Sequence, residues 1–428
     1  MKRSIRSYNI DDLSLFKQKI FEWSKNFSSS IFLNSNNYQN RLGDYESILA
    51  VDAYSKIPFT NKNSLKKLED YKNNTKDWLF GYFSYDLKNE LENLKSNNES
   101  SFDLPNLFFF QPKKIWIIRY NKIEAQYINQ SEIEKDWKNI NSIKLEKNFK
   151  NLDNVKLEPR LSKSKYEEKI KKMLFHINRG DIYEANFCME WFSKNSKINP
   201  ENVYYNLNRI SKTPMSAFFK ENNFYLISSS PERFIKRIDD KIISQPIKGT
   251  SRRDSDVLID SNLKNELHIN EKERSENIMI VDLVRNDFSR ISLPGSVKVS
   301  ELCKVYPFEQ VHQMISTIEC KIHRNLRFLD IIKSTFPMGS MTGAPKIKAL
   351  EIIEDLEVSK RGLYSGALGY IDPRGNFDFN VIIRSLIYDS KKNHLSFHVG
   401  SAITSKSTPN NEYHECLLKA QPMISILK

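Results

Sequence analysis

The chain has 428 residues, more than one ordinary core absorbs, so two domains or one large elaborated domain are expected. Hydrophobic residues make up 39% of the chain, but no stretch approaches the ~20 uninterrupted apolar residues of a membrane helix. The four cysteines form no CxxC pair and the seven histidines no HExxH pair, which argues against disulfides and against a metal held by Cys or His. These features predict a soluble, cytoplasmic protein.

The formal net charge of +13 is the one bulk property that suggests nucleic-acid binding. The lysines, however, are diluted by acids and asparagines, and there is no RNP1 pattern, zinc finger or unbroken basic run. A solvated, Lys/Asn-rich surface explains the charge without a nucleic-acid or membrane partner. A positive field would also favour an anionic small substrate.

Residues 1–155 form the first of two predicted regions. Loose polar stretches separate short apolar segments, which predict strands at Trp78–Tyr85, Leu107–Phe110 and Trp116–Tyr120. A break at residues 112–114, which includes a proline, divides the last two strands. We therefore expect a β-rich N-terminal region.

Residues 156–428 form the second region, in which strands and helices are mixed. Ser164 and Glu167 fit a capping box ahead of a helix that Gly180 ends. Further strands are expected at 217–219, 224–228 and 233–238, and further helices at 272–285, 326–336, 345–357 and 412–418. Without a regular βαβ rhythm, this mixture predicts an α+β fold.

The segments Ser230–Phe234 and Gln245–Thr250 read as a hairpin that turns near Asp239. A tight turn would bring Glu232 and Lys248 within about one residue of cross-strand register. A plain surface pair is one explanation. The other is a buried lysine that loses its proton through desolvation and acts as base or nucleophile, beside a protonated carboxyl acting as acid.

Two pairs of glutamates each have a spacing of three residues: Glu273 with Glu276, and Glu412 with Glu415. On a helix, each pair shares one face. If the two pairs face each other, they would suit a hard ion with oxygen ligands, such as magnesium. The alternative is that both pairs are exposed to solvent on helix surfaces and bind nothing.

The stretch Phe336–Lys346 contains two glycines and leads into a predicted helix, which is typical of an anion site. It is not a Walker loop, because no Gly-Lys-Ser/Thr follows. A plain turn is the alternative.

Taken together, these segments resemble the chorismate-utilising enzymes, the family of anthranilate, aminodeoxychorismate, isochorismate and salicylate synthases. The resemblance is carried by six ordered stretches: Gly180–Asn186, Ser230–Phe234, Pro246–Thr250, Glu276–Asp287, Phe336–Lys346 and Gly400–Lys419. It implies a sandwich of largely antiparallel sheets with helices packed outside and the site in a cleft.

The resemblance also implies magnesium and a set of site residues. Glu276 and Glu415 are expected to contact the ion, with Glu273 and Glu412 acting through water. The resemblance implies further substrate contacts at Thr250, Tyr364, Arg384, Gly400 and Lys419. It also implies that His312 lies near the ring of the substrate.

Two positions suggest which branch of the family the chain resembles. Pro246–Thr250, with Lys248 where anthranilate synthases carry alanine, looks like the aminodeoxychorismate branch. Glu184 stands where isochorismate and salicylate synthases place a water-activating lysine, so ammonia is the expected nucleophile. The resemblance thus implies a Mg-dependent synthase component that converts chorismate to 4-amino-4-deoxychorismate, for 4-aminobenzoate and folate, with ammonia from a separate glutamine amidotransferase. Anthranilate synthase component I and an inactive chorismate-binding homologue are the alternatives.

The family mechanism assigns roles to two of these residues. Glu232 would protonate the departing hydroxyl, and Lys248 would add to the ring as a transient nucleophile. Two segments differ from the family pattern: Gly400-Ser401-Ala402 replaces a glycine-rich run, and Phe32–Ser35 only loosely resembles the element that lines a tryptophan pocket in relatives.

Overall fold

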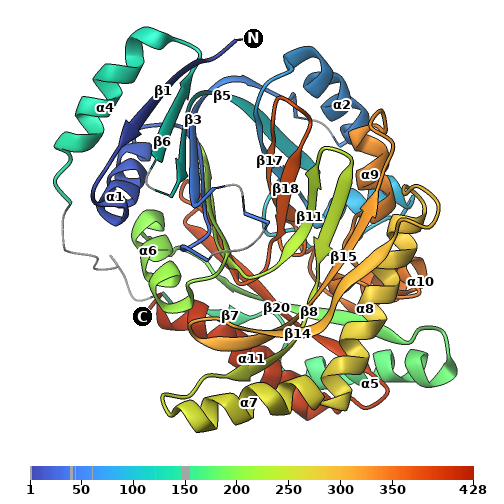
Figure 1. The fold of residues 1–428 in the computed structure, drawn as a ribbon. Helices are drawn as coiled ribbons and strands as arrows, with labels where there is room; N and C mark the ends of the chain where they lie inside the picture. Colours follow the sequence, from blue (N-terminus) through green and yellow to red (C-terminus); the bar gives the residue numbers. More distant parts are fainter. Residues whose placement is uncertain (1, 39–41, 44, 60, 121, 146–154) are drawn as a thin grey trace.

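The computed structural model describes residues 2–38, 42–43, 45–59, 61–120, 122–145 and 155–428. Within them, twenty strands form one hydrogen-bonded sheet that divides into two arms, and every ladder between named strands is antiparallel (Figure 1). The first arm contains β1 (Ser4–Asn9), β2 (Ser29–Asn34), β3 (Ser47–Lys56), β6 (Lys122–Tyr127), β7 (Glu158–Pro159), β8 (Glu184–Ser193), β9 (Met215–Glu221), β10 (Phe224–Ser230), β16 (Gly343–Ala344), β19 (Ser385–Asp389) and β20 (His394–Thr404). The second contains β4 (Leu79–Phe83), β11 (Arg233–Ile238), β12 (Lys241–Gln245), β13 (Ile247–Arg252), β14 (Lys298–Pro307), β15 (Val311–Lys321), β17 (Ala367–Ile371) and β18 (Phe377–Val381).

The two arms meet at one long strand, β5 (Leu107–Arg119). Its first residues pair with β4, its last residues pair with β6, and β3 runs along most of its length. The predicted break at residues 112–114 is therefore wrong. Pro112 is tolerated because it lies beside a register shift in β3, between Ala53 and Ser55, where the ladder is already irregular.

Helices cover the outer faces of the sandwich (Figure 1). An aromatic-rich core lies between the arms and joins Ile31 and Ile48 of the first arm to Phe80 and Leu368 of the second. The helices are α1 (Leu13–Ser24), α2 (Ser64–Thr75), α3 (Lys88–Leu91), α4 (Ile133–Ser142), α5 (Lys163–Arg179), α6 (Pro200–Ser211), α7 (Val257–Ile269), α8 (Glu271–Ser289), α9 (Phe328–Thr335), α10 (Lys346–Leu356) and α11 (Pro409–Ser425), with short 3₁₀ turns η1 (Tyr85–Leu87), η2 (Gln130–Glu132) and η3 (Gly339–Met341). This architecture confirms the predicted α+β sandwich.

Helix α5 shows how local chemistry sets an element. Its apolar positions face the core at helical spacing, and Gly180 ends it in the left-handed conformation at φ 86°. The predicted cap, Ser164, is wrong. Ser162 occupies the N-cap instead and accepts a hydrogen bond from the Lys165 amide, because the helix begins earlier, at Lys163.

Strands of residues 1–155 pair directly with strands of residues 156–428. β2 pairs with β9 and β4 pairs with β17, so both regions contribute to both arms. The division into two regions stays a prediction about the chain, and residues 146–154, just before its boundary, lie outside the described residues.

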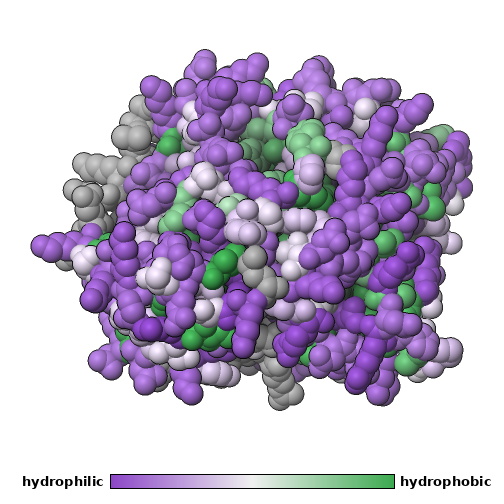
Figure 2. Space-filling model, turned by 90° about the horizontal axis from the view of Figure 1, so that it is seen from above, coloured by the Kyte–Doolittle hydropathy of each residue, from purple (hydrophilic) through white to green (hydrophobic). Residues whose placement is uncertain are grey.

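The exposed surface can be followed on one face of the molecule. Figure 2 shows one face that is mostly hydrophilic, with hydrophobic residues in small separate groups. Among the described residues, none of the helices is both long enough and apolar enough to cross a membrane.

Candidate active site

Lys248 leaves the ladder of its own strand and reaches across to β8. Strand β13 pairs with β15 at Ile247 and again at Thr250, with a register shift between them. In that irregularity, Lys248 Nζ donates to Glu184 Oε1 at 2.9 Å, and the two side chains are only 11% and 2% exposed. The predicted hairpin of β11 and β12 is present, but Lys248 lies beyond it, so the predicted cross-strand register with Glu232 is wrong.

The protonation state of Lys248 is set by its carboxylate neighbours. Burial alone would lower the pKa of Lys248, but the negative charges of Glu184, Glu276 and Glu232 outweigh burial and raise it. The lysine is therefore an ammonium in the free protein. These charges oppose the loss of the proton through desolvation, so a proton acceptor is needed before Lys248 can act as a nucleophile.

Glu232 has the environment of a buried acid. It stands just before β11, and its Oε1 accepts a hydrogen bond from Ser340 Oγ at 2.6 Å. Burial raises the pKa of Glu232 to about 7, although Ser340 and the charge of Lys248 favour the ionised form. A carboxyl with this pKa holds a proton that it can donate near neutral pH.

The raised pKa of Glu232 predicts a pH-dependent stability. Its folded pKa lies above its unfolded value of 4.5, so its stabilising contribution is present below pH 4.5 and is lost as pH rises through about 7. Glu232→Gln removes this ionisation and should stabilise the protein at pH 8 relative to wild type by on the order of 2 kcal/mol, with less gain at pH 5. Urea unfolding at both pH values measures the effect. An equal stability change at both would contradict the assignment.

Three of the four candidate metal ligands form one electrostatic cluster with Lys248. Glu273 and Glu276 lie on α8, and Glu415 lies on α11. Burial raises the pKa of Glu276 to about 7 and also raises that of Glu273, to which the charge of Glu415 adds. The fourth, Glu412, is buried on α11 and acts electrostatically on Tyr166 of α5.

Lysines balance part of this carboxylate charge. Lys419 Nζ lies 2.7 Å from Glu415 Oε1, and Lys272 Nζ lies 3.8 Å from Glu276 Oε1. Glu276 Oε1 is nevertheless buried without a hydrogen-bond partner among the described residues, as is Glu412 Oε2. Unsatisfied carboxylate oxygens fit a hard divalent cation. The described residues do not, however, place three such groups close enough to form a ready-made metal site.

The candidate substrate contacts lie on several different elements. Arg384 lies after β18, and burial lowers its pKa. No ion pair to it occurs in the described part of the chain. Tyr364 is buried and stacks on His398 of β20, with ring centroids 5.4 Å apart. Thr250 is exposed on β13, two residues from Lys248.

Gly400 is held close to β8 in the ladder of β20, opposite Cys188. A Cβ there would lie 2.6 Å from Cys188 Sγ, so only glycine permits this approach. The Gly400 carbonyl accepts from Lys419 Nζ at 2.9 Å, which brings two predicted contacts together.

His312 of β15 is buried, and its Nε2 lies 2.9 Å from Asp260 Oδ1 of α7. Its Nδ1 has no hydrogen-bond partner among the described residues. The ring thus has one nitrogen fixed by a carboxylate and one free, which suits a residue near a substrate as well as a structural one.

Comparisons with known proteins agree with this geometry. A family model described as chorismate binding enzyme matches residues 29–425. The chain is a member of the chorismate-binding enzyme family. It is 31% identical to aminodeoxychorismate synthase component 1 of Klebsiella aerogenes, over 81% of this chain and 76% of that protein. It is 33% identical to anthranilate synthase component 1 of Saccharolobus solfataricus, over 82% and 80%.

Solved structures show the same fold. Anthranilate synthase component I from Streptococcus pneumoniae TIGR4 superposes with a TM-score of 0.77 at 24% identity, covering 89% of this chain and 92% of that one. The menaquinone-specific isochorismate synthase MenF of Escherichia coli gives 0.76 at 16% identity, covering 100% and 95%. The predicted family and fold are therefore confirmed.

In this chorismate-binding enzyme, the stretch Phe336–Lys346 contacts Glu232, and no side chain caps the helix α10 that follows it. Ser340 of η3 holds Glu232, and β16 then pairs Gly343 and Ala344 with the start of β8. A Cβ on Gly343 would lie 2.1 Å from the Glu184 carbonyl oxygen, so the stretch can approach β8 only through glycine.

Gly343→Ala should therefore lower the free energy of unfolding by ~3 kcal/mol or more, because the clash is with backbone and cannot be relieved by a rotamer change. Gly295→Ala is the matched control. A Cβ at Gly295 would meet nothing within 4 Å. The substitution should therefore lower the free energy of unfolding by only ~1 kcal/mol, because alanine is strained at the φ of 72°. Chemical denaturation measures both, and equal losses would contradict the argument.

Two residues of this site were not predicted as site residues. Glu184 was noted only as the residue standing in place of a lysine, and no local pattern marks it as the partner of Lys248. Arg361 is fully buried, pairs with Glu357 and donates to the carbonyls of Met341 and Asn186. It thereby ties η3 to β8, a role visible only in three dimensions.

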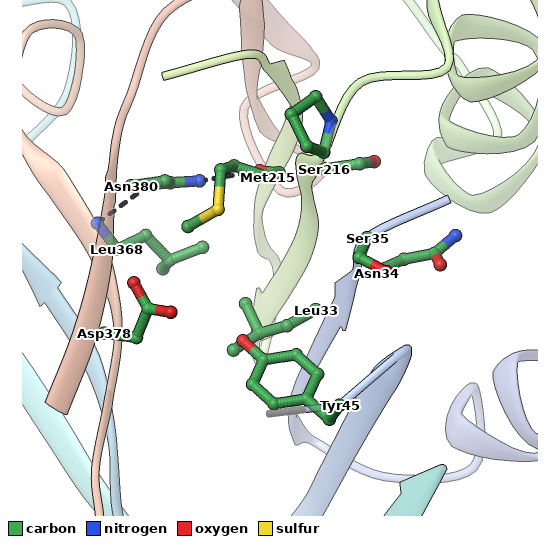
Figure 3. Close-up of a pocket in the computed structure, with 10 residues that line it drawn as sticks. Leu33, Asn34, Ser35, Tyr45, Met215, Ser216, Leu368, Asp378 and Asn380 are labelled. Atoms are coloured by element: carbon green, nitrogen blue, oxygen red, sulfur yellow. Dashed lines mark hydrogen bonds between the residues drawn. The ribbon is translucent and has the colours of Figure 1, made fainter. Parts of the chain in front are cut away.

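The segment that loosely resembles a tryptophan-pocket element does border a hollow. Leu33, Asn34 and Ser35 line it together with Tyr45 and Asp378 (Figure 3). The cavity measures about 20 Å³, which is room for about one water. The hydrogen bond from Asn380 Nδ2 to the Met215 carbonyl, 3.0 Å, closes one side.

Proposed function

We propose that this chorismate-binding enzyme is the synthase component of an aminodeoxychorismate synthase. It would convert chorismate to 4-amino-4-deoxychorismate, on the way to 4-aminobenzoate and folate, with ammonia supplied by a separate glutamine amidotransferase. The observation that carries the proposal is Lys248, which lies within Pro246–Thr250 with its side chain 11% exposed and donates a hydrogen bond to Glu184. The printed names of several relatives support it.

Substrate orientation is assigned to cationic side chains. Chorismate is a dicarboxylate, and Arg384 is a partly buried cation without an ion pair in the described residues. A guanidinium of this kind suits a bidentate hold on one carboxylate. We assign the remaining contacts with the substrate to Tyr364, Thr250, the amide near Gly400 and the ammonium of Lys419.

The carboxylates of α8 and α11 would hold a magnesium ion. Glu276 and Glu415 are the proposed direct ligands, and Glu273 and Glu412 would act through water. When bound, the ion would neutralise a substrate carboxylate and fix its position. Lys272 and Lys419, which balance Glu276 and Glu415 in the free protein, would give up those contacts.

The chemical steps then belong to Glu232 and Lys248. Glu232 donates its proton to the departing ring hydroxyl, which leaves as water. Lys248, as the free amine, forms a bond to the ring in the same step. Ammonia then enters at the carbon that lost the hydroxyl, the bond to Lys248 breaks, and the pyruvyl group is retained. His312, with one nitrogen fixed by Asp260, would face the ring.

Anthranilate synthase component I is the second candidate, because a relative of that name is similar at 33% identity. The two functions differ in product. We would incubate the purified chain with chorismate, magnesium and ammonium and identify the product by chromatography and mass. A pyruvyl-retaining amino product that an added lyase converts to 4-aminobenzoate supports the proposal. Anthranilate contradicts it, and a failure to consume chorismate favours an inactive homologue.

A further inference from the structure

Lys248 can attack only after losing a proton, and the structure supplies one hydrogen-bonded acceptor for it. The Nζ atom donates to Glu184 Oε1 at 2.9 Å, and both side chains are almost completely buried. The second oxygen, Glu184 Oε2, is also buried and has no hydrogen-bond partner among the described residues. A buried carboxylate with one unsatisfied oxygen has capacity to hold a proton.

The position of Glu184 is fixed by backbone on two sides. It is the first residue of β8, which pairs with Thr404 of β20 on one side and with Ala344 of β16 on the other. The backbone at Gly343 lies so close to the Glu184 carbonyl that β16 is packed directly against β8. The backbone that carries this carboxylate therefore cannot shift away from Lys248 without disturbing both ladders, and the hydrogen bond to Nζ orients the side chain.

We propose that Glu184 accepts the proton of the Lys248 ammonium when chorismate enters and so generates the nucleophile. This inference rests on the proposed function. The proton moves from Nζ to Glu184, the lysine lone pair forms the bond to the ring carbon, and the hydroxyl leaves as water with the proton of Glu232. When ammonia displaces Lys248, the departing amine recovers its proton from Glu184. The product ammonium releases the proton that restores Glu232.

Substrate entry provides the driving force. In the free protein, Lys248 is faced by Glu184 on β8, Glu232 before β11, and Glu276 on α8, with Glu273 on the same helix nearby. These negative charges hold the proton on the lysine. A cation held by the carboxylates of α8, when bound, would weaken this hold on the proton. Chorismate would exclude water from Lys248 and Glu184, and a buried neutral pair has a lower desolvation cost than a buried ion pair.

The variant Glu184→Gln keeps the size and one hydrogen-bond acceptor but cannot take the proton. We expect amination at neutral pH to fall by about 10²-fold, with an unchanged Kd for chorismate. The deficit should narrow as pH rises, because Lys248 can then lose its proton to solvent. Glu184→Asp retains a base and should recover part of the rate. Thermal melts confirm that each variant is folded.

Glu190→Gln is the matched control. Glu190 lies on the same strand, is equally buried, and pairs with Arg160 at 2.6 Å rather than with Lys248. Its replacement should leave the rate and its pH dependence as in wild type.

Two readouts separate this inference from the proposed function. The first is product formation with ammonium, and the second is the rate at which chorismate and magnesium, without ammonium, form an adduct on Lys248, followed by intact-protein mass. Slower adduct formation in Glu184→Gln supports the inference even if the aminated product proves to be a different one. A variant within about threefold of wild type at every pH overturns it, as does a wild-type protein that forms no adduct.

Discussion

Replacing Lys248 with alanine should abolish amination of chorismate, with turnover reduced by about 10³–10⁶-fold. The side chain is only 11% exposed, lies 2.9 Å from Glu184, and belongs to an irregular part of β13 where the register with β15 shifts. Without it, ammonia would have to attack chorismate directly. Steady-state rates with chorismate, magnesium and ammonium measure the effect.

Lys248→Ala also leaves the buried Glu184 without its counterion, which costs stability. Lys248→Arg keeps the charge but supplies no nucleophile at neutral pH. It should be folded, by thermal melt, and still inactive. Lys304→Ala, an exposed lysine on β14 paired with Glu301, should behave as wild type. An active Lys248→Arg protein would remove the covalent step from the proposal.

Replacing Glu276 with glutamine should produce the second largest loss. Its Oε1 is buried without a hydrogen-bond partner in the described residues, and burial raises its pKa to about 7, both of which a bound cation would relieve. Loss of one ligand charge should raise the magnesium concentration needed for half-maximal rate by about 10–100-fold and lower the rate at saturating chorismate by about 10²–10³-fold.

Calorimetric titration of magnesium or manganese into the chorismate complex tests the same site without relying on turnover. Asp282→Asn is the control on the same helix, because Asp282 is exposed and pairs with Arg285. The metal assignment would be wrong if Glu276→Gln bound the ion as wild type does, or if wild-type activity survived complete chelation.

Local signals in the sequence were sufficient for much of the fold. Helix α8 was expected at 272–285 and spans Glu271–Ser289, because its apolar positions recur at helical spacing and Asn270 caps it. The strand expected at 233–238 coincides with β11. Errors arose where tertiary context overrides local pattern. Pro112 lies within β5 because a register shift in β3 accommodates it, and nothing nearby in the sequence signals that shift.

Helices α1, α2 and α4 were missed in the N-terminal region, where polar residues dilute their apolar faces. Helix α1, for example, buries Phe16, Ile20 and Trp23 against the first arm, yet Lys17 and Lys19 interrupt the apolar run. Propensity alone could not decide between helix and loop there.

For the candidate site too, local signals identified residues, whereas tertiary contacts could not be predicted. The types of residue needed were recognisable in six ordered stretches, but their pairing was not. Lys248 was expected beside Glu232 because they are close in sequence, whereas its hydrogen-bond partner is Glu184, 64 residues away. The counterions of the glutamates, in contrast, follow from local spacing, because Lys272 with Glu276 and Lys419 with Glu415 are each four residues apart on one helix. Only the effect of Lys272 of α8 on Glu415 of α11 required the two helices to be placed in three dimensions.

The central claim is that this protein adds nitrogen to the ring carbon that loses its hydroxyl and leaves the pyruvyl group in place. The most direct test is to supply chorismate, magnesium and isotopically labelled ammonium and to locate the label in the product by NMR. We expect the label on the ring carbon that lost its hydroxyl, in a product that still carries the pyruvyl group. Label on the ring carbon adjacent to the one that carries the carboxylate, with pyruvate released, would contradict the proposed function.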